Sequence, residues 1–570
     1  MTSLSQALAA AAQTRLQLTH PSAPFALEAA PCGAAYSQRF ARAPALLTDW
    51  LDAGRAFADQ PFVHYYPTAA GEAALAAPEV WTYSRFYAAV ERLSAYLQHD
   101  CALPAGVRVA LCAANSPQWL VAFAAASYAG VVLAPMNSMN SGAEMRQVLA
   151  ELQPALLFCD RSRYQQLQEA GGCGDARVIL LEELEQYASA LPFAVVARGP
   201  QDDALVVYTS GSAARPKGAV FTHDAVCQAL YNLEYITAFA ALTSPLVMAR
   251  INAAANAPCL LSCVPYFHVS GLYAQVFSTL KNGRKLVMLP RWSPKHAIEL
   301  IAREKVTAFS AAPSMVMQLM AESQFGQPEV TGSLIALGFG GSGMPQNLRD
   351  ALAEKMPNTM SGTGFGMTET GGAGVGASGA LFALRSASAG LASPIMQISI
   401  QDEKGRELPV GQAGEICLRG PTLMRGYHAQ PEQSQEALRG GWLHTGDWGY
   451  VDADGYCHVL DRIKDVVNRH GEKIAASEVE SCLLQHPAVR EVAVVALPDP
   501  LTLEQVAAYV VLHPSQESDE MRMAQVKAHA QAHLAAYKVP QTWHFGQEAL
   551  PRNAMGKVLK DEIRRWLTAV

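Results

Sequence analysis

Hydroxyl side chains, glycine and one lysine are concentrated in the segment Tyr208-Thr-Ser-Gly-Ser-Ala-Ala-Arg-Pro-Lys-Gly218. Three hydroxyl residues surround Gly211, and Lys217 follows behind a proline. Hydroxyl donors, backbone N–H groups and one mobile cation are what a loop needs to hold a polyphosphate. The GxxxxGK[ST] spacing of the P-loop is absent. The segment therefore predicts either a phosphate-binding loop of another kind or a surface turn rich in small residues.

A second glycine-rich segment, Gly338-Phe-Gly-Gly-Ser-Gly343, matches the GxGxxG pattern of dinucleotide-binding folds. It follows an apolar run, Leu334–Leu337, and precedes a predicted helix over Gln346–Lys355. Such folds carry an acidic residue about 20 positions later, but the chain there reads Gly362-Thr-Gly-Phe. We therefore expect no NAD site, but a loop whose glycines let the backbone approach a flat ligand.

A third segment, Gly362-Thr-Gly-Phe-Gly-Met-Thr-Glu369, is predicted to be another loop. Phe365 could stack on a base, Thr368 could reach a phosphate, and the Glu369 carboxylate could bind Mg²⁺. The alternative is an ordinary turn around a buried phenylalanine.

Three single residues are further candidates, each with a structural alternative. His268 lies among aromatic residues in Pro265-Tyr-Phe-His-Val-Ser-Gly271, where a satisfied core histidine is the alternative. Asp447 is predicted to lie in a turn, where its carboxylate either accepts hydrogen bonds from hydroxyl groups or caps the turn. Lys557 follows a glycine near the C-terminus and could be a solvated charge.

The composition limits the class of protein. The chain has 570 residues, too many for one hydrophobic core, so two or more domains are expected. Hydrophobic residues make up 50% and charged residues 16%, which suits a globular α/β enzyme. A formal net charge of -7 gives no general attraction to nucleic acid. The 11 cysteines lack the spacing of a metal or disulfide framework, and no signal-peptide or transmembrane pattern is present, so we expect a cytoplasmic protein.

Helix and strand patterns alternate along most of the chain, which predicts βαβ units and largely parallel sheets. The predicted helices include Thr82–Leu97, Pro117–Ala129, Ser477–Gln485 and Asp519–Leu534. The predicted strands include Val107–Cys112, Gly130–Pro135, Leu156–Cys159, Arg177–Leu181, Ala204–Tyr208, Leu260–Pro265, Lys285–Leu289 and Ala308–Ser310. Short alternating strands at Ile395–Ile400, Gly414–Leu418 and Tyr456–Val459 indicate a β-rich subdomain.

These segments predict an α/β fold with two domains. The large N-terminal domain, residues 1–463, would hold two mostly parallel sheets with helices and the β-rich subdomain. The C-terminal domain, residues 464–570, would be a small α+β unit.

Read in their order along the chain, these motifs resemble the acyl-adenylate-forming superfamily of acyl-CoA synthetases, peptide-synthetase adenylation domains and firefly luciferase. The resemblance extends from about Trp81 to Lys560 and includes Asn115-Ser-Pro117, Ala134-Pro-Met-Asn137 and Gly414-Glu-Ile-Cys-Leu-Arg-Gly-Pro421. Within the superfamily, three segments are most similar to the fatty acyl-CoA ligases of bacteria: Pro265–Gly271, Leu289-Pro-Arg-Trp292 and Asp461-Arg-Ile-Lys-Asp465.

The resemblance implies a reaction in two steps. A carboxylic acid and ATP form an acyl-adenylate with release of pyrophosphate, and the acyl group then passes to a thiol, usually that of coenzyme A. The implied cofactors are ATP, Mg²⁺ and coenzyme A, and a homodimer is compatible with the sequence. Because two anions must be brought together, catalysis is expected to rest on positioning and charge neutralisation.

The resemblance also implies a role for each matching residue. Lys557 would bridge the substrate carboxylate and the α-phosphate, His268 would border the acyl pocket, and Glu369 would hold Mg²⁺. Thr368 would contact the α-phosphate, while Asp447 and Arg462 would bind the ribose hydroxyls. The β- and γ-phosphates would be held by Thr209, Ser210, Gly211, Ser212, Ala213, Ala214, Arg215 and Lys217. The adenine would lie between Gly340, Gly341, Ser342 and Phe365. The neighbouring residues Thr363, Gly364, Gly366 and Met367 would also belong to the cofactor site.

Lys464 matches the hinge position of the family. The C-terminal domain is expected to rotate about it, which would withdraw Lys557 and bring the segment around Gly471 to the pantetheine tunnel.

One departure concerns the phosphate-binding loop. The family usually reads Ser-Gly-Thr-Thr-Gly where this chain has Ser210-Gly-Ser-Ala-Ala214. Ala213 removes one hydroxyl donor, a loss on the order of 1–3 kcal/mol if nothing replaces it, and Ala214 replaces a glycine. We expect a slower enzyme rather than an inactive one.

The predicted function is an ATP-dependent acid–CoA ligase for a hydrophobic acid. The alternatives are an adenylating enzyme that loads a carrier protein and a non-catalytic relative that binds nucleotide or acyl ligand. The acid itself is left open between fatty, aromatic and alicyclic.

Overall fold

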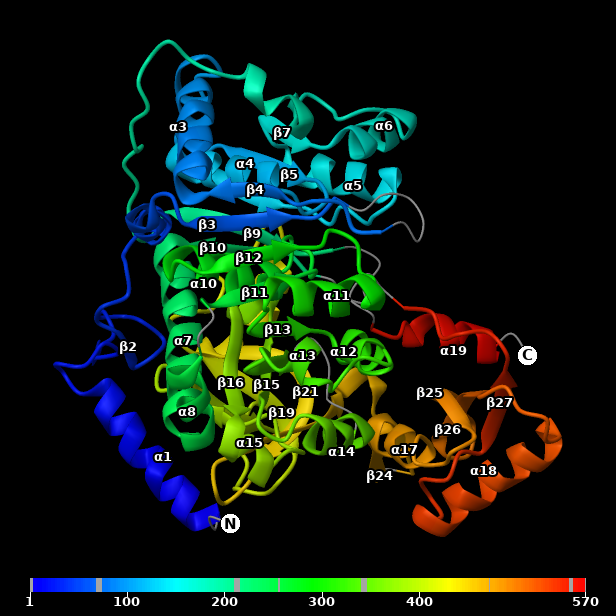
Figure 1. Ribbon diagram of the computed structural model, residues 1–570. Coiled ribbons are helices and arrows are strands. Elements are labelled where there is room, and N and C mark those ends of the chain that lie inside the picture. The colour runs from blue at the N-terminus through cyan, green and yellow to red at the C-terminus, as the bar shows by residue number, and fades with distance from the viewer. Residues whose placement is uncertain are drawn as a thin grey trace.

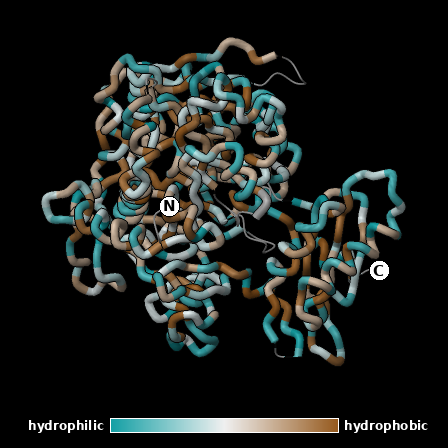
Figure 2. Tube along the Cα trace, turned by 60° about the horizontal axis from the view of Figure 1, so that its bottom comes forward, coloured by the Kyte–Doolittle hydropathy of each residue, from teal (hydrophilic) through white to brown (hydrophobic). Residues whose placement is uncertain are grey.

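The computed structural model describes residues 4–67, 74–209, 216–254, 257–339, 346–470, 472–552 and 557–568. It forms a larger body, which contains most of the chain, and a smaller unit near the C-terminus, drawn in orange and red in Figure 1. Each of the two has its own hydrophobic interior (Figure 2). The predicted α/β class, with mostly parallel strands in the large sheets, is confirmed.

The first sheet of the larger body has seven strands. Its central strands are parallel, and two strands at one edge run antiparallel to their neighbours. In spatial order the strands are β20 (Gly426–Tyr427), β10 (Gly218–Thr222), β9 (Asp203–Tyr208), β6 (Val132–Pro135), β5 (Arg108–Cys112), β7 (Leu156–Cys159) and β8 (Arg177–Leu180). The buried apolar runs that predicted β5, β6, β7 and β9 are typical of parallel strands covered on both faces.

The second sheet has nine strands, and its order places the glycine-rich strand β15 next to β14. In spatial order the strands are β17 (Leu391–Ala392), β16 (Gly372–Ser378), β15 (Met360–Met367), β14 (Ala336–Phe339), β13 (Ala308–Ala311), β11 (Cys259–Ser262), β12 (Lys285–Met288), β3 (Pro61–Tyr65) and β4 (Glu79–Thr82). The pairs from β15 to β3 are parallel, whereas β16, β17 and β4 pair in the antiparallel sense. A separate pair is formed by β1 (Leu27–Ala29) and β2 (Gln38–Phe40).

Helices cover both sheets (Figure 1). Most begin at a polar N-cap, such as Ser116, whose side chain accepts from Trp119 N at the start of α4. The helices of the larger body are α1 (Leu4–Thr19), α2 (Leu47–Asp52), α3 (Tyr83–His99), α4 (Pro117–Tyr128), α5 (Gly142–Leu152), α6 (Arg161–Glu169), α7 (His223–Leu242), α8 (Pro245–Ala253), α9 (Val269–Gly271), α10 (Ser278–Lys281), α11 (Pro294–Glu304), α12 (Pro313–Met320), α13 (Pro328–Thr331), α14 (Gln346–Lys355), α15 (Gly379–Leu384) and α16 (Pro431–Ala437).

The long helix α7 contacts strands of both sheets, β9 and β10 of the first and β16 of the second. Sequence analysis did not predict it. Its N-terminal half is buried on all sides, so its sequence carries no clear amphipathic stripe. In the described part of the chain no single helix has the length and apolar character needed to cross a bilayer, and only α7 with α8, bent by 99°, meets that test as a pair.

A four-stranded antiparallel sheet forms the predicted β-rich subdomain. Its order is β18 (Gln397–Gln401), β19 (Gly414–Arg419), β21 (Leu443–Val451) and β22 (Cys457–Arg462). The smaller unit follows β22 directly.

The smaller unit is a sheet covered on both faces. Its strands are β23 (Val467–Arg469), β24 (Glu472–Ile474), β25 (Val489–Asp499), β26 (Leu503–Leu512) and β27 (Thr542–Gly546). Its helices are α17 (Ala476–Leu483), α18 (Asp519–His533) and α19 (Lys560–Thr568). Alternate residues of β25 and β26 belong to two separate apolar clusters, one on each face of the sheet.

Two local predictions were wrong. The segment Gly362–Glu369 is not a loop, because all but its last two residues belong to β15. Its glycines permit close strand contact: a Cβ at Gly366 would lie 1.9 Å from Gly372 O. Asp447 does not lie in a turn but inside β21.

Candidate active site

Glu369 lies where the two large sheets of the larger body meet. It belongs to the short helix η4 (Thr368–Thr370) that follows β15 of the nine-stranded sheet, and it is 6% exposed. Tyr427, on β20 of the seven-stranded sheet, donates its phenolic O–H to Glu369 Oε1 at 2.7 Å. Lys217 directly precedes β10, the neighbour of β20, and its Nζ lies 4.9 Å from the centroid of the Tyr427 ring. A single tyrosine thus contacts a carboxylate through its hydroxyl group and an ammonium group through its ring.

Sequence analysis missed Tyr427, although this residue follows closely on the motif Gly414–Pro421. Burial, and secondly the charge of Glu369, raise the pKa of the Tyr427 hydroxyl, so it remains a donor. Thr370 was also missed: its Oγ1 accepts from Met367 N and donates to Met367 O, both at 2.9 Å. These bonds fix the turn that carries Glu369.

Of the predicted phosphate-binding loop, the structure describes the two ends. Thr209 N donates to Lys217 O at 2.9 Å, and Lys217 N donates to Thr209 Oγ1 at 3.3 Å, so the base of the loop is closed. The predicted residues that lie outside the described ranges are Ser210, Gly211, Ser212, Ala213, Ala214, Arg215, Gly340, Gly341, Ser342 and Gly471.

The predicted adenine segment lies along β15 and leads directly into η4, which carries Glu369. Phe365 is half-buried against the main hydrophobic core. The residues of this segment that the structure describes are Thr363, Gly364, Phe365, Gly366 and Met367 on β15 and Thr368 in η4.

Asp447 and Arg462 are register partners on β21 and β22. Arg462 Nε lies 2.6 Å from Asp447 Oδ1, and Asp447 is 4% exposed. Burial raises the pKa of the Asp447 carboxyl to about 6, although Arg462 and Lys557 act in the opposite direction. Antiparallel pairing therefore brings together an acid and a base that are 15 positions apart in the sequence.

Lys557 interacts electrostatically with the charged groups described above. Burial lowers the pKa of its ammonium group and Arg462 lowers it further, whereas Asp447 and Glu369 raise it. The charge of Lys557 also acts on His268. Lys557 lies just before α19 of the smaller unit, and the other four residues lie in the larger body. The described part of the structure thus brings both bodies to one site.

His268 directly precedes α9 and is 7% exposed. Its ring centroid lies 4.5 Å from that of Phe267. Burial lowers the pKa of the imidazole to about 4, and Lys557 acts in the same direction, so His268 is neutral at neutral pH. Among the described residues its Nε2 is a buried polar atom without a hydrogen-bond partner. A buried ring nitrogen of this kind is available to a ligand.

Lys464 lies in the short helix η6 (Ile463–Asp465), between β22 of the larger body and β23 of the smaller unit. Its Nζ lies 3.6 Å from Asp561 Oδ2 on α19. Asp465 Oδ1 lies 3.7 Å from Arg564 Nη2 on the same helix. The predicted hinge is thus tied by two ion pairs to the helix that follows Lys557.

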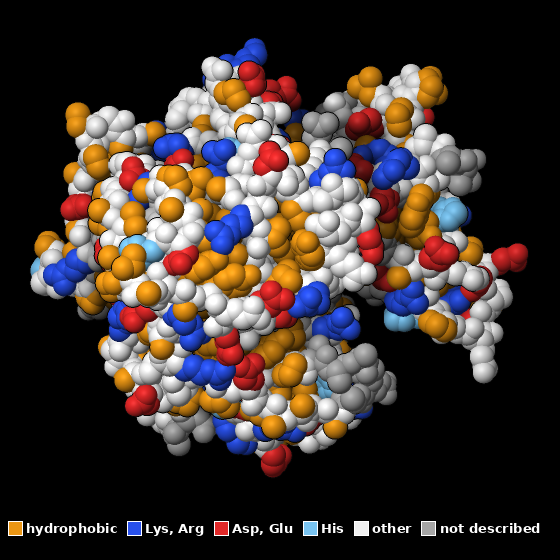
Figure 3. Space-filling model, turned by 90° about the horizontal axis from the view of Figure 1, so that it is seen from above, with side chains coloured by type: hydrophobic (Ala, Val, Ile, Leu, Met, Phe, Trp, Pro, Cys, Tyr) orange, Lys and Arg blue, Asp and Glu red, His pale blue; other side chains and the backbone are white. Residues whose placement is uncertain are grey.

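The surface near this junction carries mixed charges. In Figure 3, basic and acidic side chains are interspersed on the larger body, and a notch opens beside its contact with the smaller unit. The described side chains of this face form no continuous basic surface.

Comparison with known proteins gives a consistent result. A family model described as "AMP-binding enzyme" matches residues 54–428, and one described as "AMP-binding enzyme C-terminal domain" matches residues 478–557. A feruloyl-CoA synthase of an Amycolatopsis species is 31% identical over 484 residues, which cover 85% of this chain and 93% of that protein. A long-chain-fatty-acid–CoA ligase of Bacillus subtilis is 27% identical over 510 residues, which cover 83% of this chain and 87% of that protein.

A solved structure extends the comparison to the fold. The crystal structure of ATP-bound MatB from Rhodopseudomonas palustris superposes with a TM-score of 0.77 at 26% identity. The match covers 90% of this chain and 98% of that one.

Proposed function

The chain belongs to the family of AMP-binding enzymes, and on that premise we propose that its clustered residues join a hydrophobic carboxylic acid to ATP and then to coenzyme A. The protein is an acid–thiol ligase of the AMP-forming type. In the first step the acid and ATP give acyl-AMP and pyrophosphate. In the second, the thiol of coenzyme A displaces AMP and the thioester forms.

The observation that carries this proposal is the convergence of charged and polar groups on Lys557. One ammonium group, partly desolvated, acts on the side chains of Asp447, Glu369 and His268. The first step brings the negative substrate carboxylate to the negative α-phosphate, and a cation between them removes their repulsion. A compact ammonium group at the end of a flexible chain suits this task.

The remaining groups bind and orient the substrates. Thr209 and Lys217 hold the terminal phosphates, and Phe365 packs against the adenine. Asp447, kept beside Arg462, accepts from the ribose hydroxyls. The neutral His268 donates its Nε2–H, for which the described residues offer no acceptor, to the substrate carboxylate.

Glu369 fits a magnesium ion. Mg²⁺ prefers carboxylate oxygens, and Tyr427 holds one oxygen of this carboxylate in place. When bound, the ion polarises phosphoryl oxygens and neutralises charge on the polyphosphate.

Replacing Glu369 by glutamine is expected to raise the Mg²⁺ concentration required for half-maximal ATP binding about tenfold, because a neutral amide binds Mg²⁺ more weakly than a carboxylate. Calorimetric titration of ATP at a series of Mg²⁺ concentrations measures this. Glu432→Gln, which changes an exposed residue of α16, is the control and should leave the Mg²⁺ dependence unchanged. An unchanged Mg²⁺ dependence in Glu369→Gln would remove Glu369 from the proposal.

Binding of adenosine is expected to weaken as the pH falls through 6. The ribose hydroxyls need an ionised Asp447, whose pKa is raised to about 6 by burial, so about one-tenth of the carboxylate is ionised at pH 5. The dissociation constant should therefore rise about tenfold between pH 7.5 and pH 5. Adenosine is chosen because it has no phosphate that titrates in this range. Asp447→Asn should bind weakly at both values, and a similar pH slope in that variant would contradict the assignment.

The acid is proposed to have an apolar aromatic or fatty body. Its support is that similar proteins are a feruloyl-CoA synthase and a long-chain-fatty-acid–CoA ligase. A panel of aromatic, fatty, alicyclic and short polar acids, assayed for ATP-dependent pyrophosphate release, tests it. Apolar acids should react and short polar acids should not. No reaction with any acid would favour a non-catalytic relative.

The acyl acceptor is tested separately. Coenzyme A and an isolated carrier domain are supplied in turn with ATP and the best acid, and AMP release is measured. Release with coenzyme A alone is expected, and release with the carrier domain alone would favour a carrier-loading enzyme.

We also propose that the mobile boundary lies at Lys464, so that residues 1–463 and 464–570 move as two domains. Its support is the position of Lys464 between β22 and β23.

A further inference from the structure

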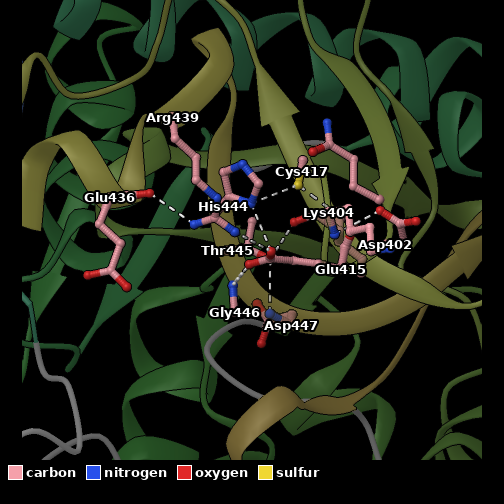
Figure 4. Close-up of polar contacts among 12 residues, drawn as sticks. Asp402, Lys404, Glu415, Cys417, Glu436, Arg439, His444, Thr445, Gly446 and Asp447 are labelled. Atoms are coloured by element: carbon pink, nitrogen blue, oxygen red, sulfur yellow. Dashed lines mark hydrogen bonds and ion pairs between the residues drawn. The ribbon is translucent and has the colours of Figure 1, made fainter. Parts of the chain in front are cut away.

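A cluster of polar side chains lies between β19 and β21, next to Asp447 (Figure 4). In this antiparallel pair Glu415 lies opposite Trp448, and Cys417 lies opposite His444. The three residues between His444 and Trp448 thus lie opposite the single residue Ile416. Such a bulge bends a strand and re-aims a side chain. Its last residue is Asp447.

The Glu415 carboxylate contacts the middle residue of the bulge, Gly446, and the residue that precedes the bulge, His444. Its Oε1 accepts from Gly446 N at 3.1 Å, and its Oε2 lies 2.8 Å from His444 Nδ1. Arg439 Nη2 donates to the same Oε2 at 3.1 Å. Gly446 has a φ of +70°, a conformation that favours glycine.

Thr445 completes the arrangement from inside the bulge. Its Oγ1 donates to Ile416 O on β19 at 2.7 Å and accepts from Asp447 N at 3.1 Å. Thr445 therefore fixes the backbone N–H of Asp447, and Glu415 fixes the backbone N–H of the preceding residue, Gly446. On the neighbouring strand β22, Arg462 Nε lies 2.6 Å from Asp447 Oδ1.

Glu415, Cys417 and His444 are also a group of three potential metal ligands found among the described residues. The hydrogen bonds of these three side chains explain why they lie close together, so no metal ion is needed to explain the cluster. Both carboxylate oxygens of Glu415 already accept hydrogen bonds, Oε1 from Gly446 N and Oε2 from Arg439 Nη2. Burial raises the pKa of the Cys417 thiol to about 12, which disfavours the thiolate that binds metal.

We propose that Glu415, acting through His444 and the Gly446 N–H, is a positioning residue that sets the Asp447 carboxylate for the two ribose hydroxyls of the nucleotide. The inference rests on the proposed function, in which Asp447 binds ribose. Glu415 touches no substrate in this arrangement. Its effect is confined to the geometry of the bulge.

The test compares binding of AMP with that of 2′,3′-dideoxy-AMP, which lacks both hydroxyls, by calorimetry. Wild type should prefer AMP. In Glu415→Gln the shape is kept, but an amide replaces the carboxylate that faces His444, Arg439 and Gly446 N. The preference for AMP should fall about tenfold while the affinity for dideoxy-AMP stays unchanged.

Matched variants separate positioning from damage to the fold. Cys417→Ala alters a buried side chain of the same cluster and should keep the preference for AMP. His444→Asn retains a donor near the Nδ1 position and should restore part of the preference that His444→Leu loses. Glu415→Gln combined with Asp447→Asn should lose no more preference than Asp447→Asn alone, because both changes act on one contact.

An unchanged preference for AMP in Glu415→Gln would overturn the inference, and so would an equal loss of affinity for both nucleotides in that variant. A wild-type protein that bound both nucleotides equally would overturn it as well. Failure of the proposed function would give a different result. A protein that showed no pyrophosphate exchange but kept a Glu415-dependent preference for AMP would contradict the proposed function and leave the positioning role intact.

Discussion

Lys557→Ala is expected to abolish formation of the acyl-adenylate while sparing thioester formation from preformed acyl-AMP. In the first half-reaction the ammonium group neutralises two approaching anions, and loss of one such stabilising group lowers the rate by about a thousandfold. In the second half-reaction the bond between the carboxylate and the α-phosphate already exists, so the same cation has no repulsion to offset. Pyrophosphate exchange measures the first step, and consumption of synthetic acyl-AMP with coenzyme A measures the second.

Arg552→Ala is the control for this prediction, because Arg552 precedes Lys557 on the same segment and pairs with Glu491 at the surface. It should change neither half-reaction more than about twofold, since exposed ion pairs contribute little. If Lys557→Ala slowed both half-reactions equally, Lys557 would not have the proposed role, and a general effect on the smaller unit would be indicated.

Lys464→Pro is expected to slow the thioester step about a hundredfold while changing adenylation less than about fivefold. In the structure the charges of Asp447 and Glu369 act on Lys557, and we propose that this is the arrangement for adenylation. Proline fixes φ near −65°, so a rotation that requires a different φ at this position is prevented. Single-turnover measurement of each half-reaction separates the two effects.

Lys464→Ala is the matched control for the hinge. It removes the ion pair with Asp561 but leaves the backbone free to rotate. Its thioester step should stay within about threefold of wild type, because this pair is partly exposed. Equal thioester rates in the alanine and proline variants would place the hinge elsewhere in the chain.

Much of the fold follows from local patterns. Apolar runs of strand length predicted the central strands of both large sheets, because strands covered on both faces carry no polar alternation. The amphipathic spacing of Phe86, Val90, Leu93 and Leu97 predicted α3, and all four are buried. The failures at α7 and β15 share a cause, because the sequences of these two elements are determined by tertiary contacts rather than by their own period.

The candidate site could be predicted only in part. His268, Glu369, Asp447 and Lys557 were each identified by type and context, but their proximity depends on four separate segments of the chain. Tyr427 has no chemical signature of its own in the sequence, and its contact with Glu369 arises only where the two sheets meet. The bulge before Trp448 is invisible in the sequence, because strand register depends on the partner strand.

The ion pairs between η6 and α19 have a mechanical consequence. Asp561 and Arg564 pair with Lys464 and Asp465 of η6, so the proposed hinge contacts the helix that starts three residues after Lys557. Lys560, the first residue of α19, pairs with Glu480 of α17 at 2.8 Å, which fixes α19 within the smaller unit. We therefore expect a rotation at Lys464 to move α19 and Lys557 together with the rest of the smaller unit. On the proposed mechanism, the Lys557 charge leaves the site whenever the smaller unit rotates, so one movement would end adenylation and begin the thioester step.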